Sequence, residues 1–172
     1  MKEIKKILED FDGRHTGELN TILETLERSQ KQLLALLKLA QSSKEPSVEI
    51  GATWLIKNLM EQGTRLDEKA SFKLAEALPL MKDKDSVLHL LQAIPFISFT
   101  EEIDQLLLES CDDILREQDY KFARAWAFNC LGLVAQHQKK YQSKILKRLN
   151  HALEEEPASV KARIRNVLKK MP

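Results

Sequence analysis

An apolar helix pattern returns four times along the chain, and it limits the possible folds more than any other feature. The copies begin at Val48, Val87, Ala123 and Val160, with steps of 39, 36 and 37 residues. At 4, 7 and 8 residues after each start, most side chains are apolar or small, which is the spacing of one side of an α-helix. Self-similarity at such a period is typical of helical-repeat solenoids. The sequence therefore predicts consecutive helix pairs rather than a closed bundle.

The apolar positions of this pattern are predicted to form the core. They recur in the same register from copy to copy, and one side of each helix must face its neighbours. The residues expected to be buried are Leu55, Leu91, Ala127, Cys130, Leu131, Ile164 and Val167.

The composition supports an all-α chain. Five glycines and five prolines among 172 residues leave little material for strands joined by tight turns. We therefore expect at least about 70% helix in a single domain over residues 1–172. With 43% hydrophobic and 31% charged residues, the chain resembles neither a disordered nor a membrane-spanning protein. The mixed charges of residues 1–6 lack an apolar signal core, so a cytoplasmic location and no membrane contact are expected.

Helix start and stop signals divide the chain into an extra N-terminal helix over residues 1–15 and helix pairs over residues 17–172. Gly13 ends the extra helix, and the next helix either continues to Ser42 or breaks near Ser29. Pro95 is expected to kink or end its helix early. The predicted N-caps are Thr16, Asp67, Asp83 or Asp85, Thr100 and Asp119, and the prolines in first turns are Pro46 and Pro157. About four antiparallel pairs follow from these boundaries.

Two segments resemble the HEAT-repeat signature of armadillo-like proteins. They are Glu45-Pro46-Ser47-Val48-Glu49 and the segment that begins Ala123-Arg124. In that family the second helix of each pair opens with an acid, often a proline, then valine and arginine. Only Arg124 fills the arginine position, where the other copies carry Glu49, Leu88 and Lys161. Over residues 17–172 the resemblance implies an α-α superhelix, a solenoid whose second helices line a concave side for binding, and no particular activity.

The concave side implied by this resemblance supplies the candidate partner-binding residues. They are Trp54, Asn58, His89, Gln92, Trp126, Asn129, Arg163, Asn166 and Lys170. Tryptophan and arginine dominate the energetic centres of interfaces, so the two tryptophans would suit a groove for a protein or peptide. Large aromatic residues on such helices also fill the space between neighbouring pairs, so Trp54 and Trp126 have a second interpretation as core residues.

Positive charge gathers at the C-terminal end. Residues 137–172 contain ten Lys and Arg and three Glu, a net charge of +7. This end could bind the phosphates of a nucleic acid through Lys161, Arg163, Arg165, Lys169 and Lys170. It could instead be a terminal repeat that is polar for solubility. Tyr141 is the one aromatic residue between these bases along the sequence, which favours the polar end.

No pattern in the sequence indicates a reaction. The four histidines are scattered, without the pair spacing of a metal site, and there is no glycine-rich phosphate loop or nucleophile elbow. Cys111 and Cys130 lack metal-ligand spacing and are predicted to be buried thiols. We assign no catalytic, cofactor-binding or metal-binding residue, and we expect neither a cofactor nor enzymatic activity.

Three function classes remain, and the leading one is a non-enzymatic HEAT-like scaffold or adaptor that binds a protein or peptide. The second is a nucleic-acid-binding solenoid that uses the basic end. The resemblance to HEAT-like DNA alkylation repair glycosylases belongs to this class, but no catalytic aspartate between aromatic residues can be matched. The third is a structural subunit that packs on its own copy through the apolar residues of 19–37.

Overall fold

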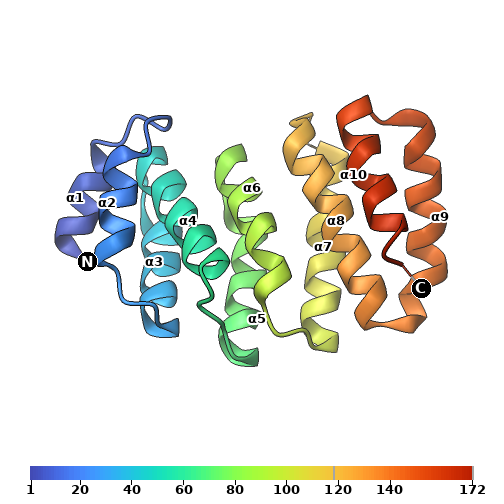
Figure 1. The fold of residues 1–172 in the computed structure, drawn as a ribbon, viewed down its shortest axis with the longest axis horizontal. Helices are drawn as coiled ribbons and strands as arrows, with labels where there is room; N and C mark the ends of the chain where they lie inside the picture. Colours follow the sequence, from blue (N-terminus) through green and yellow to red (C-terminus); the bar gives the residue numbers. More distant parts are fainter. Residues whose placement is uncertain (118, 172) are drawn as a thin grey trace. The chain divides into compact units, whose positions relative to one another are not determined.

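The computed structural model describes residues 1–117 and 119–171, and helices account for 79% of it (Figure 1). Within these residues there are ten α-helices and two short 3-10 helices, and no strand. The prediction of an all-α chain is therefore confirmed. The α-helices are α1 (Lys2–Glu9), α2 (Gly17–Thr25), α3 (Gln30–Ser42), α4 (Pro46–Glu61), α5 (Glu68–Ala77), α6 (Lys84–Ala93), α7 (Glu101–Glu117), α8 (Lys121–His137), α9 (Lys139–Glu155) and α10 (Ala158–Leu168). The 3-10 helices η1 (Leu78–Leu80) and η2 (Ile94–Phe96) extend α5 and α6.

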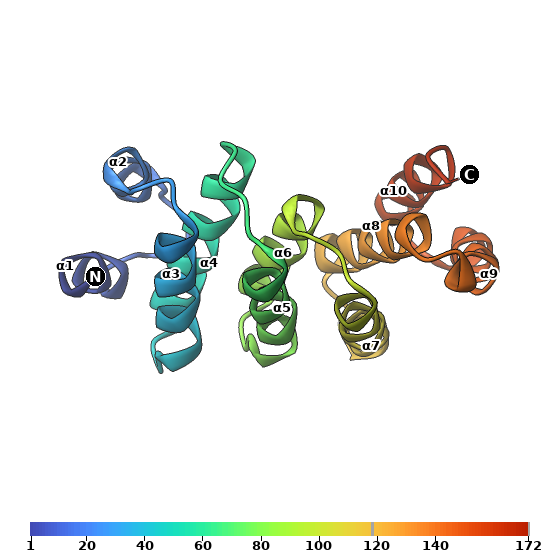
Figure 2. The same cartoon turned by 90° about the horizontal axis from the view of Figure 1, so that it is seen from below.

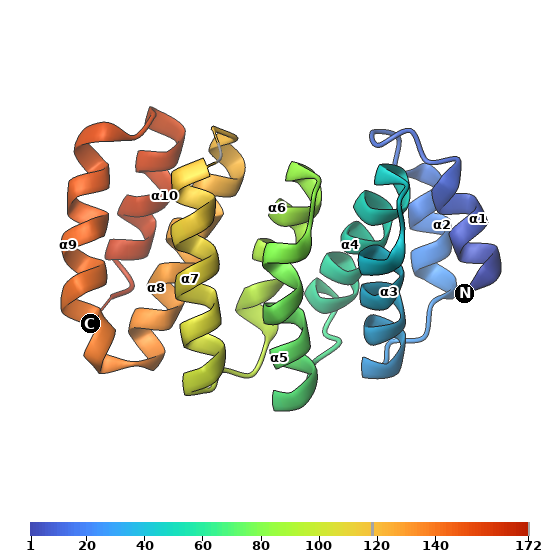
Figure 3. The same cartoon turned by 180° about the vertical axis from the view of Figure 1, so that it is seen from behind.

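The helices form two compact units, unit 1 (Met1–Ser98) and unit 2 (Phe99–Pro172). In unit 1, α3 packs on α4, α4 packs on α6, and α3 contacts α5 (Figure 3). Both α1 and α2 pack against α4. Gly51 permits this approach, because a Cβ atom there would lie 2.6 Å from Cδ2 of Leu8.

In unit 2, α8 lies at the centre and packs against α7, α9 and α10. Figure 2 shows α7 and α9 on one side of the unit and α8 and α10 on the other. Gly132 of α8 brings α10 close, because a Cβ atom at this position would collide with Val167. We refer to α4, α6, α8 and α10 as the second helices.

Most boundaries follow the predicted signals. The side chains of Asp67 and Asp83 accept backbone N–H bonds as N-caps of α5 and α6, and Gly63 ends α4 with a φ of 103°. Helix α6 ends at Ala93, two residues before Pro95, as expected.

The starts of α3 and α8 decide one open alternative and correct one prediction. The long helix after Thr16 breaks, since Ser29 adopts an extended conformation and its side chain accepts the N–H of Gln32 to start α3. Two short helices, rather than one, therefore precede the pair α3 and α4. The prediction that Asp119 caps α8 is wrong, because the N-cap of α8 is Tyr120.

The predicted core is confirmed. All seven residues of the repeating apolar pattern are buried, from Leu55 and Leu91 in unit 1 to the five in unit 2. The leucines at 19, 23, 33 and 37 are also buried inside unit 1, so they offer no apolar surface to a second copy of the chain.

Candidate functional site

The four candidate residues of unit 1 lie half-buried on α4 and α6. The side chain of Asn58 donates from Nδ2 to the carbonyl oxygen of Trp54, at 2.8 Å. Nδ1 of His89 lies 3.2 Å from Oγ1 of Thr53. Burial and the nearby charge of Lys57 lower the pKa of His89 from 6.5 to about 4, so the ring is neutral at pH 7. Asn58 and His89 thus already have partners within the unit.

In unit 2, two candidate residues lie in direct contact. The guanidinium carbon of Arg163, on α10, lies 4.4 Å from the centre of the Trp126 ring on α8. Both side chains are half-buried. A cation over a tryptophan face is attracted by the ring quadrupole, so the contact holds the planar guanidinium against α8. Trp126 is therefore both a packing residue and part of the surface.

Trp126 belongs to a continuous uncharged stripe on α8. Within unit 2 this helix packs against α7, α9 and α10, and positions 122, 126, 129 and 133, which are exposed or half-buried, share one side of it. We call these residues, Phe122, Trp126, Asn129 and Leu133, the α8 stripe. The Phe122 side chain is 51% exposed, and the other three are half-buried. A helix that leaves aromatic and aliphatic side chains open in this way is typical of an interaction surface.

Basic residues of α10 border the α8 stripe. Arg163 and Asn166 are three residues apart, which places them on the side of α10 next to Trp126, and Lys170 follows in the turn after α10. Lys161 and Arg165 lie on the other side of α10, and Nζ of Lys161 donates to the carbonyl oxygen of Glu154, at 3.0 Å. The five bases proposed for phosphate binding thus divide between two sides of the helix.

Comparison of the chain with protein-family models, with curated proteins and with solved structures found no match.

The fold adds aromatic contacts to the bases of unit 2 that their order in the sequence does not show. In the sequence only Tyr141 lies among the bases of the C-terminal end, yet the fold brings cations to three aromatic rings of unit 2. Arg163 lies over Trp126, Lys121 over Phe122 at 5.4 Å, and Lys140 over Tyr141 at 5.0 Å. The repeat register could have indicated the contact between Trp126 and Arg163, because each residue lies three positions after the start of its copy.

Several bases of unit 2 pair with acids of neighbouring elements. Arg148 and Lys140 on α9 form ion pairs with Asp112 and Glu101 on α7. These pairs reduce the effective charge of the basic end and attach α9 to α7.

Arg124 links α8 to the turn that precedes α10. Its Nε donates to Glu156 at 3.1 Å, a second nitrogen also contacts this carboxylate, and Nη1 donates to the carbonyl oxygen of Leu115 at 2.7 Å. Glu156 is buried and raises the pKa of Arg124. The HEAT-like arginine position is thus occupied by a structural ion pair.

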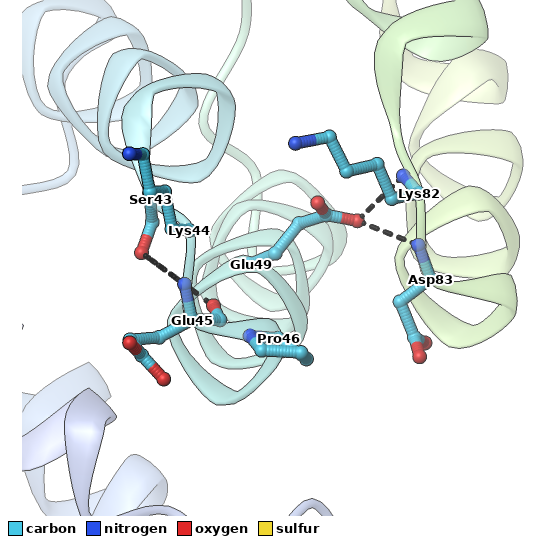
Figure 4. Close-up of a pocket in the computed structure, with 7 residues that line it drawn as sticks. All are labelled: Ser43, Lys44, Glu45, Pro46, Glu49, Lys82 and Asp83. Carbon is cyan, nitrogen blue, oxygen red and sulfur yellow. Dashed lines mark hydrogen bonds between the residues drawn. The ribbon is translucent and has the colours of Figure 1, made fainter.

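Glu49 makes the corresponding link in unit 1 with the opposite chemistry. Figure 4 shows its side chain directed at the turn before α6, where its Oε1 accepts the backbone N–H groups of Lys82 and Asp83, both at 2.9 Å. Glu49 is buried and lines a small pocket of about 120 Å³. The sequence marked Glu49 only as a departure from the signature, and its partners 33 and 34 residues away gave no local signal.

A polar cluster inside unit 2 joins α7 to the end of α8. Oδ2 of the buried Asp104 lies 2.6 Å from Nδ1 of His137, whose ring lies 5.6 Å from that of Phe99. Among the described residues Oδ1 of Asp104 has no hydrogen-bond partner. Burial raises the pKa of Asp104, and the bond to His137 opposes this rise. The cluster was not predicted, because the two residues are 33 positions apart.

The cysteines behave as buried thiols. Sγ of Cys111 donates to the carbonyl oxygen of Ala127 at 3.6 Å, and the neighbouring Cys111 together with burial raises the pKa of Cys130. A thiol with a raised pKa is a poor nucleophile. In the described part of the chain no three His, Cys, Asp or Glu side chains are placed to hold a metal ion.

A wider groove of about 490 Å³ lies between α3 and α5 in unit 1. Its apolar lining is Leu34, Ala35 and Leu37, and Lys38 and Lys73 also line it.

Across residues 1–117 and 119–171, no helix combines the length and the apolar character needed to cross a membrane.

Proposed function

We propose that the protein is a non-enzymatic, HEAT-like α-solenoid scaffold that binds a protein or peptide through the open sides of its second helices. Two features support the solenoid arrangement. Second helices pack on each other within each unit, α4 on α6 and α8 on α10. In both units the residue after the start of the repeat pattern reaches the turn before the next second helix, Glu49 in unit 1 and Arg124 in unit 2.

The observation that carries the binding role is the α8 stripe with Arg163 over Trp126. Aromatic residues and arginine are enriched at interface hot spots, where a rigid, partly buried side chain loses little entropy on binding. The contact with Arg163 holds Trp126 in place before any partner arrives. Phe122, half exposed one turn earlier, extends the same apolar surface.

The nucleic-acid alternative, DNA-repair-like activity included, has weaker support. It draws on the bases of α10, but Lys161 and Arg165 lie on the opposite side from Arg163, and Arg163 occupies one face of the Trp126 ring. The homo-oligomer alternative relied on the apolar residues of 19–37, and Leu19, Leu23, Leu33, Leu36 and Leu37 among them are buried in the core of unit 1, which leaves Leu26 and Leu34 half-buried.

Selection from a random peptide-display library tests the proposal. Peptides enriched on the full-length protein are then measured by fluorescence anisotropy against the wild type, Phe122→Ala and the matched control Leu146→Ala. Leu146 is a 41% exposed apolar residue on α9 of the same unit, away from the α8 stripe. We expect micromolar peptides whose Kd rises at least about tenfold with Phe122→Ala and stays unchanged with Leu146→Ala. Failure to enrich any peptide, or equal binding by the Phe122 variant, would refute the proposal.

A further inference from the structure

We infer that the partner segment bound by unit 2 is an acidic amphipathic helix, with apolar side chains on the α8 stripe and carboxylates facing Arg163 and Lys170. This inference rests on the proposed function and names the chemistry of its partner. It is carried by three properties of the surface: the spacing of the stripe, the sign of the charge beside it, and the state of its aromatic rings.

The spacing of the α8 stripe matches the side of a helix. Its residues stand at positions i, i+4, i+7 and i+11 of α8, so the stripe is about 16 Å long at 1.5 Å per residue. A partner helix that presents anchors at i, i+3, i+4 and i+7 spans about 10 Å between its outer anchors, so the stripe is long enough to receive all of them. No member of the stripe is charged, so the centre of the contact is apolar.

The two helices that carry and border the stripe have bases but no acids. Helices α8 and α10 contain no Asp or Glu. Arg124 already pairs with Glu156. The basic border of the stripe is therefore Arg163 on α10 and the exposed Lys170 in the turn that follows α10. Unit 1 differs, because α4 carries Lys57 and Glu61 as an ion pair at 3.4 Å. An acidic partner would therefore meet favourable charge at α8 and α10, where a basic one would meet repulsion.

The aromatic rings favour a peptide over a single-stranded nucleic acid. Base stacking needs an open ring face, but the Trp126 ring is half-buried and Arg163 occupies one of its faces. Leu133 adds apolar area that an aliphatic side chain fills well and that offers no stacking surface to a base. An arginine held against a tryptophan keeps its N–H groups for a carboxylate, to which it can donate two parallel bonds.

Designed peptide probes test this inference. The first probe is an 18-residue fluorescein-labelled helix with Leu and Phe at i, i+3, i+4 and i+7 and Glu elsewhere. The second has Lys in place of every Glu, the third is the acidic peptide in scrambled order, and the fourth is a 20-nucleotide oligo-dT. Kd values are measured by anisotropy with the full-length protein at 0.15 M and 0.5 M salt.

The acidic helix is expected to bind at least about tenfold more tightly than the basic and scrambled peptides, and more tightly than oligo-dT. The double substitution Arg163→Ala and Lys170→Ala should weaken it about tenfold and flatten its salt dependence, while Leu146→Ala leaves it unchanged. Circular dichroism of each variant confirms that the helices are intact.

Three results would overturn the inference. Equal binding of acidic and basic helices would show that charge plays no part. If the protein instead prefers library peptides that contain no acidic residues, and Phe122→Ala weakens their binding, charge again plays no part, but the scaffold proposal stands. Tighter binding of oligo-dT that competes with the acidic helix would make the surface a nucleic-acid site and overturn both proposals for unit 2.

Discussion

Glu49 gives the sharpest test of how the repeats of unit 1 are joined. Its Oε1 accepts two backbone N–H groups from the turn before α6, and the side chain is buried. In Glu49→Ala both N–H groups lose their acceptor. In Glu49→Gln a neutral amide oxygen can take the same place.

The expected cost follows from these two bonds. A hydrogen bond to a charged group contributes about 1.5–3 kcal/mol, and the low end applies because both bonds are only partly buried. Glu49→Ala should therefore lower the free energy of unfolding of unit 1 by about 3 kcal/mol. Glu49→Gln should cost about 1.5 kcal/mol, because neutral bonds are roughly half as strong. The control Glu76→Ala, an exposed acid on α5, should change it by less than about 0.5 kcal/mol.

The chain offers a clean probe for this measurement. It has two tryptophans, Trp54 in unit 1 and Trp126 in unit 2. In a Trp126→Phe background, urea unfolding followed by fluorescence reports on unit 1 alone. A midpoint for Glu49→Ala equal to that of Glu76→Ala would refute the argument that the carboxylate joins the repeats.

Three further substitutions test the core and the buried polar groups. Leu91→Ala should lower the free energy of unfolding by about 2–5 kcal/mol in urea melts, since the side chain is fully buried; an unchanged melting temperature would contradict the repeat register. The pKa of His89 is lowered from 6.5 to about 4, so the histidine takes up a proton in the unfolded state at a higher pH than in the folded state, and the free energy of unfolding falls as pH drops from 6.5 towards 4. His89→Gln should remove up to about 3 kcal/mol of this loss at pH 4. If the wild type and the variant lose stability in parallel, the argument is refuted. Burial raises the pKa of Asp104, so the ionised carboxylate destabilises the folded state once the pH is above the usual carboxyl range. Asp104→Asn keeps a partner for His137 and should leave the melting temperature at pH 7 equal or higher. A lower melting temperature would show that the charge is stabilising.

The sequence predicted the helices well because their signals are local. Asp67, Asp83 and Gly63 act within a few residues of themselves, and the burial of Leu91 follows from periodicity. The break at Ser29 could not be decided, because the leucine pattern continues through it and only the cap geometry interrupts the helix.

The candidate surface was predicted in part. Trp126 and Arg163 were both named from the repeat register, but their contact depends on how closely α10 approaches α8. Gly132 sets that approach, which no local pattern indicates. The buried pair of Asp104 and His137 also required the fold, because each residue looks like an ordinary surface residue in its own helix.

The links at Glu49 and Arg124 have a consequence for the order of the repeats. At one register position the chain places an acceptor in unit 1 and a donor in unit 2, and each faces a turn of the opposite kind. A repeat moved to the other place would direct an arginine at backbone N–H groups or a glutamate at the buried Glu156. The repeats are therefore not interchangeable modules: shuffled or duplicated versions of this chain should fold only when each link travels together with the turn that receives it.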